Sequence, residues 1–211
     1  MKYEASRKHL TAIIVSALFL MAWVVAGGAQ TQAPASPQEQ FQKARENLLK
    51  GDFNDAAAEI REAASFLKSE SAQAAGEAKQ DLIQSAQNLD KLADGVEKKA
   101  VSSENDLNEN FTRAEYALAR YYQSKASEAW AKKEASQAGQ YLKAAGIQLE
   151  DAFTWAGGRI DEKSKEANQK AKDVGERMEN GVAVAGSDVA KYFEEAKKEM
   201  NDAAHRMPSL R

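Results

Sequence analysis

The 211-residue chain contains no cysteine. That absence excludes a disulfide framework, thiolate zinc sites, iron–sulfur clusters and cysteine nucleophiles. Only two histidines are present, so a histidine-rich metal site is not expected either. The 29 basic side chains are outnumbered by 32 acidic ones. Because nucleic-acid-binding domains normally carry a basic excess, we expect no nucleic-acid partner, and we predict neither a metal nor a cofactor.

Proline is also scarce, with Pro34 and Pro37 near the start and Pro208 near the end. Residues 38–207 contain none and are rich in alanine, glutamate, lysine and glutamine, which have high helix propensities. Apolar side chains recur every three or four residues, as the buried stripe of a helix requires. The sequence predicts an all-α protein: an antiparallel helical bundle built from two hairpins, plus a long amphipathic C-terminal helix.

The first 29 residues have the plan of a secretory signal peptide. Residues 1–9 carry three basic side chains against one acid, residues 10–25 are almost entirely apolar, and small residues follow up to Ala29. We predict cleavage after Ala29 and export to the periplasm or the extracellular space. The alternative is an uncleaved N-terminal membrane anchor, because a membrane span needs roughly 20 residues. The cleaved chain carries 26 basic and 31 acidic side chains, a net charge of −5.

The exported part divides into a tether, a bundle and a tail. Residues 30–37 contain two of the prolines and form a flexible tether. Residues 38–156 form the predicted bundle. Within it, the apolar period predicts either one helix over 54–100 or two helices with a break near 69–76. Ser103 is predicted to cap the next helix, because an acidic residue follows three positions later.

The tail is predicted to be one long amphipathic helix over residues 159–207. Gly157 and Gly158 interrupt the apolar period before it, so we place the end of the bundle at Gly157. The apolar side of the tail consists mainly of alanine, valine and methionine, and it resembles a coiled-coil seam. We expect it to fold back on the bundle or to pair with another molecule.

Residues 44–63 (ARENLLKGDFNDAAAEIREA) align with residues 126–145 (ASEAWAKKEASQAGQYLKAA) at a constant offset of 82. In each copy, a short polar turn separates two helical segments that carry small residues where the helices must approach. The copies resemble tetratricopeptide-type helical hairpins. The small positions of that family match Ala44, Ala56 and Ala63 in the first copy and Ala126, Ala138 and Ala145 in the second, and its later large position matches Ile60 and Leu142. This resemblance implies a helical scaffold for protein contact.

Aromatic side chains are concentrated in residues 111–155. The simpler interpretation is that they form the best-packed part of the core, because large rings bury the most apolar area. The alternative is that Tyr122, Trp130 and Trp155 line a groove for a partner helix or peptide.

Residues capable of catalysis do not form a recognisable constellation. His205 is the one histidine left after export, and Asp202 shares a helix face with it, but a carboxylate-bridged metal site in a bundle needs further ligands. No nucleophile stands beside a base and an orienting group, so we predict no enzyme activity.

We expect an exported, non-catalytic helical protein of the cell envelope that acts as a protein-interaction or structural module. Its partner would be another protein or a second copy, bound through helix packing. The alternative is a lipid-surface-binding protein that uses the C-terminal amphipathic helix. Membrane contact is otherwise expected only through the N-terminal segment.

Overall fold

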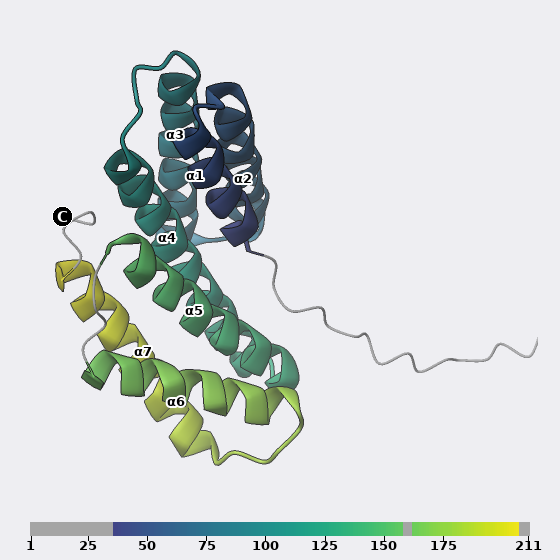
Figure 1. Cartoon of the computed structure of the whole chain (residues 1–211). Helices are drawn as coiled ribbons and strands as arrows, with labels where there is room; N and C mark the ends of the chain where they lie inside the picture. The colour runs from purple at the N-terminus through teal and green to yellow at the C-terminus, as the bar shows by residue number, and fades with distance from the viewer. Residues whose placement is uncertain (1–35, 158–161, 207–211) are drawn as a thin grey trace, which may run out of the picture. The chain divides into compact units, whose positions relative to one another are not determined.

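The computed structural model describes residues 36–157 and 162–206, which belong to one compact unit. These residues form seven helices (Figure 1): α1 (Gln38–Lys50), α2 (Phe53–Gln73), α3 (Gly76–Glu97), α4 (Glu104–Ala131), α5 (Ala135–Trp155), α6 (Glu162–Glu179) and α7 (Gly186–Arg206). No strand occurs in the described ranges, which confirms the all-α class. The predicted signal peptide, its cleavage at Ala29 and most of the tether lie outside the described residues.

Two predicted helix boundaries are confirmed. Extended backbone at Ala74 and Ala75 separates α2 from α3, within the predicted window of 69–76. α4 begins directly after Ser103, whose hydroxyl accepts a hydrogen bond from the amide of Asn105 at 3.1 Å. The bond satisfies one of the amides that the first turn of a helix leaves without a backbone partner.

The prediction of a single helix over 159–207 is wrong, because residues 180–185 separate α6 from α7. Gly181 adopts a left-handed backbone conformation with φ 71°. The amides of Gly181 and Val182 donate to carbonyls in the last turn of α6, at 3.1 and 2.8 Å. This pair of bonds is the usual way in which a glycine closes the C-terminus of a helix. The tail is therefore two segments of helix and not one rod.

The longest helix, α4, belongs to two four-helix arrangements at once. In the first, α1 packs on α2, α2 on α3, α3 on α4, and α4 contacts α1. In the second, the same order of contacts runs from α4 through α5 and α6 to α7, and α7 contacts α4. Because α5 and α6 pack against each other, the boundary predicted at Gly157 lies between two packed helices of one unit.

The two arrangements repeat each other along the chain at the offset that the sequence alignment predicts. An offset of 82 residues carries the bounds of α2 onto those of α5. It also carries the end of α3 onto the end of α6 and the start of α4 onto the start of α7. The turns repeat as well. Gly51 and Lys133 have φ values of 82° and 65°, and Lys99 and Gly181 have φ values of 58° and 71°. The duplication therefore extends over most of the described chain, beyond residues 44–63 and 126–145.

Two ion pairs between the second and third helices also recur in both copies. The first joins Arg61 to Glu97 at 2.5 Å, and its equivalent in the second copy joins Lys143 to Glu179 at 3.1 Å. The second joins Lys68 to Asp90 at 2.7 Å, and its equivalent joins Glu150 to Lys172 at 2.6 Å, with the two charges exchanged. Exposed pairs of this kind contribute at most about 1 kcal/mol each. Their recurrence identifies equivalent surfaces of the two copies.

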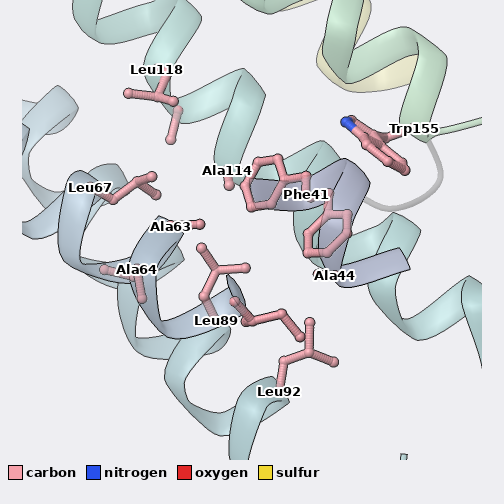
Figure 2. Packing of buried hydrophobic residues seen from close by; sticks show 14 of the residues in the cluster. Phe41, Ala44, Ala63, Ala64, Leu67, Leu89, Leu92, Ala114, Leu118 and Trp155 are labelled. Carbon is pink, nitrogen blue, oxygen red and sulfur yellow. The ribbon is translucent and has the colours of Figure 1, made fainter. Parts of the chain in front are cut away.

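The core of the first copy combines leucines, alanines and a small group of rings. Figure 2 shows Ala44, Ala63 and Ala114 among the larger side chains, where their small size lets the helices approach. Phe41 stacks on Phe111 with ring centroids 4.1 Å apart. This contact fastens the first turn of α1 to α4, because both rings are completely buried.

In the second copy, α5 and α6 approach each other more closely than they could with side chains at the point where they cross. At the crossing of α5 and α6, Gly139 and Gly175 occupy the positions of Ala57 and Ala93 in the first copy. A Cβ atom added to Gly139 would lie 2.4 Å from the carbonyl oxygen of Gly175. Backbone atoms therefore touch at this crossing, and glycine is required on steric grounds.

Candidate interaction groove

A polar groove runs along α4 between α3 and α7. It consists of two adjoining cavities of about 630 and 460 Å³, and Arg120 and Asn201 line both of them. We call it the α3–α7 groove. Its floor is one face of α4, formed by Arg113, Tyr116, Ala117, Arg120, Gln123, Ser124 and Ser127.

The two walls of the groove are formed by α3 and α7. The side chains from α3 are Glu77, Ala78, Asp81, Gln84, Ser85 and Asn88, and those from α7 are Lys197, Met200, Asn201 and His205. On all three helices the lining residues are mostly three or four positions apart, so each helix presents one face to the groove. The groove is thus built from three helical stripes that are mostly polar.

Side chains of the floor hold both walls in place. Arg120 forms ion pairs with Asp81 and with Glu77 of α3, the latter at 2.8 Å. On the other side, the hydroxyl of Tyr116 donates to the carbonyl of Met200 at 3.0 Å. These bonds fix α3 and α7 to α4 and set the width of the groove.

Basic side chains outnumber acidic ones in the lining. Arg113, Arg120, Lys197 and His205 stand against Glu77 and Asp81, and both acids are paired with Arg120. Burial raises the pKa of Asp81 above its ordinary value; Arg120 opposes this shift and Glu77 adds to it. Burial also raises the pKa of the Tyr116 hydroxyl. The two acids thus share Arg120, and the Glu77 side chain remains 87% exposed.

The lining offers mainly groups that form hydrogen bonds. Its hydroxyls, amides and guanidinium groups can donate and accept hydrogen bonds. Within residues 36–157 and 162–206, no three potential ligands from histidine, aspartate and glutamate come together as a metal site. His205 lines the groove, although its predicted neighbour Asp202 does not belong to the lining.

The three aromatic residues predicted to line a partner groove do not meet in one. Tyr122 and Trp155 are only 2% and 6% exposed, and both belong to the main core cluster. The ring of Trp155 packs edge-on against Phe111, with centroids 5.1 Å apart. Trp130 is half-buried and packs against a different cluster, which includes Ala126, Ala129 and Phe193. The rings form core, as the simpler interpretation held, because packing against other apolar groups removes their large surfaces from water.

Sequence reasoning missed the α3–α7 groove because polar residues at helical spacing usually indicate a solvated face. A feature of α4 could have indicated the groove. The polar stripe that includes Gln123, Ser124 and Ser127 shares a helix with twelve buried residues, so α4 has packed faces on both sides of a narrow polar one.

A buried carboxyl lies on another face of α4. Glu115 is completely buried, and neither of its carboxylate oxygens has a hydrogen-bond partner in the described residues. Burial, with the nearby charge of Asp151 on α5, raises the pKa of Glu115 well above its ordinary value. Burial also raises the pKa of Asp151 to about 6. The start of α1 lies next to Asp151, because the side-chain amide of Gln38 donates a hydrogen bond to the Asp151 carboxylate at 3.5 Å.

The chain matches no protein-family model, no curated protein and no solved structure significantly. The resemblance to tetratricopeptide hairpins therefore gains no support from other proteins. The repeated unit also differs from that family, because it comprises three helices where a tetratricopeptide repeat has two, and it is more than twice as long. None of the described helices is both long enough and apolar enough to cross a membrane.

Proposed function

We propose that this chain is an exported, non-catalytic helical protein of the cell envelope that binds a partner protein in the α3–α7 groove. Export rests on the signal-like pattern of residues 1–29. Binding rests on one observation: two helices stand on either side of a third and leave a polar face of it open along several turns. Helices that pack on one another normally close such a face.

Contacts between the floor and the walls of the groove support a binding role. Arg120 and Tyr116 of the floor contact both walls, and the floor is the longest of the described helices. A surface that is already ordered loses little conformational entropy when a partner binds. The repeated bundle on each side then acts as the scaffold that holds the three faces in register.

Photo-crosslinking in the cells that produce the protein tests this proposal. A benzophenone amino acid replaces Ser124, which is exposed on the groove floor, and in a control it replaces Lys91, which is exposed on α3 away from the lining. We expect a discrete protein adduct from position 124 and none from position 91. Fractionation of the same cells tests export.

The attached protein must then bind in a purified system. Identified by mass spectrometry and purified, it should bind residues 30–211, and the substitution Ser124→Trp, which fills the floor, should abolish that binding. Equal adducts from both positions, or a partner that binds Ser124→Trp as well as the original chain, would show that the groove is not the interface.

A further inference from the structure

Two carboxyl groups and the start of α1 meet on the face of α4 that carries Glu115. Glu115 is completely buried, and its carboxylate oxygens have no hydrogen-bond partner within residues 36–157 and 162–206. The charge of Asp151, on α5, acts on it. Asp151 in turn accepts a hydrogen bond from the side-chain amide of Gln38, which belongs to the first turn of α1.

A group of rings fastens the first turn of α1 beside this carboxyl. The indole nitrogen of Trp155 donates to the side-chain carbonyl of Gln38 at 3.1 Å. Phe41 meets Trp155 edge to face, with ring centroids 6.3 Å apart (Figure 2), and it stacks on Phe111. Phe111 stands one helical turn before Glu115 on α4, so the two side chains share a face. The first turn of α1 therefore packs on the face of α4 that holds Glu115.

The titratable groups around the two carboxyls do not compensate a charge on Glu115. Asp151 is a like charge, and burial raises the pKa of the Tyr122 hydroxyl, which therefore stays neutral. In the described part of the chain, no basic side chain forms an ion pair with Glu115. The other charged groups nearby are Glu150 of α5 and Lys172 of α6, which pair with each other and act on Asp151, and Glu39 and Lys43 of α1, which pair with each other at exposed positions.

Both carboxyls hold their protons more firmly when the first turn of α1 is closed over them. Burial raises the pKa of Glu115 well above its ordinary value of 4.5, and it raises the pKa of Asp151 from 3.8 to about 6. Opening of the turn lets water reach both groups, so that their pKa values return towards the ordinary ones. The open form then binds fewer protons. As the pH rises, the ratio of closed to open form falls by up to about tenfold per pH unit for each carboxyl that is charged only in the open form.

α1 is the element that these charges can displace. It is the shortest of the described helices and buries three of its 13 residues, whereas α4 and α5 bury twelve each. Opening of its first turn exposes the ring of Phe41, which disfavours the open form by a factor of roughly 10 to 150. About two pH units of linkage from one carboxyl supply a factor of the same order. Local opening is expected where few apolar contacts hold an element, and α1 meets that condition.

We infer that Glu115 and Asp151 form a pH-sensitive latch for the first turn of α1. At acid pH both carboxyls are neutral, and the turn is closed over them. As the pH rises both become charged, and the turn separates from α4 and α5 while the rest of the bundle stays folded. The latch makes the attachment of the N-terminal end of α1 depend on the pH of the surroundings. It lies apart from the α3–α7 groove and does not depend on what the groove binds.

Trp155 provides a spectroscopic test of the latch. Residues 30–211 contain Trp130 and Trp155, so the substitution Trp130→Phe leaves Trp155 as the only tryptophan. Its emission maximum and its quenching by acrylamide are measured from pH 5 to pH 9. Trp155 is 6% exposed when the turn is closed. We expect its emission to shift to longer wavelength as the pH rises, and acrylamide quenching to increase at least about threefold.

Substitutions of the two carboxyls identify the groups responsible. Glu115→Gln should abolish the increase above pH 7, because Asp151 has already lost its proton there and glutamine has none to lose. Asp151→Asn should shift the increase to higher pH, because one of the two charges is gone. The matched control Glu109→Gln, at an exposed position of α4, should leave the pH profile unchanged. Circular dichroism at pH 5 checks that all variants keep their helix content.

A second reporter separates opening of the latch from unfolding of the whole bundle. Trp155→Phe leaves Trp130, which packs in the second copy, and its emission should stay constant up to pH 9. Hydrogen exchange of residues 30–211 without substitutions should show protection lost in the first turn of α1 and kept in α3, after correction for the intrinsic pH dependence of exchange. The inference is wrong if the Trp155 signal does not change with pH, if it changes equally in Glu115→Gln, or if Trp130 and α3 change together with it.

Discussion

Glu115 should make the folded protein less stable as the pH rises. The residue lies completely buried on α4 without a hydrogen-bond partner for either carboxylate oxygen in the described part of the chain. Burial raises its pKa well above the ordinary value of 4.5. The folded chain therefore keeps the proton on Glu115 at pH values above about 4.5, where the unfolded chain releases it. Glutamine has nearly the same shape and no proton to lose, so Glu115→Gln removes this dependence.

The size of the effect follows from proton linkage. Below pH 4, Glu115 is protonated in both the folded and the unfolded chain, and the pH has no influence through it. Between the unfolded and the folded pKa, the folded chain binds one proton more, and its free energy of unfolding falls by about 1.4 kcal/mol per pH unit. Relative to the original chain, the Glu115→Gln variant should therefore gain stability as the pH rises from 5 to 7, by up to about 1.4 kcal/mol per pH unit.

Urea unfolding of residues 30–211, followed by circular dichroism at pH 5, 6, 7 and 8, measures this difference. The slope with pH is the test, because a buried amide has its own cost of lost hydrogen bonds and shifts the whole curve. Asp151, whose pKa burial raises to about 6, is present in both proteins, so the cost of its own burial enters both curves. Glu109→Gln, at an exposed position of α4, should change stability by less than about 0.5 kcal/mol at every pH. Parallel curves for Glu115→Gln and the original chain would refute the reasoning.

Three further outcomes follow from the packing. Gly139→Ala should lower the free energy of unfolding by about 1–3 kcal/mol in urea titrations, because its Cβ would meet backbone atoms of α6 at 2.4 and 2.7 Å. Gly186→Ala, where the nearest atom belongs to the Trp130 ring at 3.9 Å, should be nearly neutral; equal effects would contradict the close crossing. Truncation after Gly157 should lower the urea midpoint and increase binding of a hydrophobic dye, because α6 and α7 bury part of α5; an unchanged midpoint would make the tail dispensable. Residues 30–211 should not float with anionic vesicles, because Val189, Phe193 and Met200 of α7 are buried; robust flotation would mean that α7 leaves the bundle.

Features that depend on local sequence could be predicted, and features that depend on tertiary contact could not. The helix start after Ser103 follows from capping and is found, and the break at Ala74 is one of the two alternatives that the apolar period left open. Gly175 and Gly181 show the limit. Gly175 remains within α6 and packs against Gly139, whereas Gly181, which follows Asn180, ends the helix. The contact between Gly175 and Gly139 depends on a neighbouring helix, so local sequence does not predict it.

The candidate site also depends on tertiary contacts that local sequence does not predict. Sequence reasoning looked for a partner surface among aromatic residues such as Tyr122 and Trp155, which the fold instead buries. The α3–α7 groove is lined by arginines, amides and hydroxyls from three helices that are spread along the sequence. Each stripe by itself is indistinguishable from a solvated face. Only the fold brings the three stripes together as one groove.

The duplication explains why the groove lies where it does. α4 must present one face to the first copy and another to α5, and it buries Leu107 and Phe111 on the first and Ala119 on the second. α7 has an equivalent of the first face, because Val189 and Phe193 occupy the positions of Leu107 and Phe111 and are also buried. Its second face is polar. It carries Asn201 where α4 has Ala119 and Lys197 where α4 has Glu115, and both of these side chains are exposed. The same two residues belong to the α7 wall of the groove, so the groove lies on the face of α7 that corresponds to the face of α4 covered by α5.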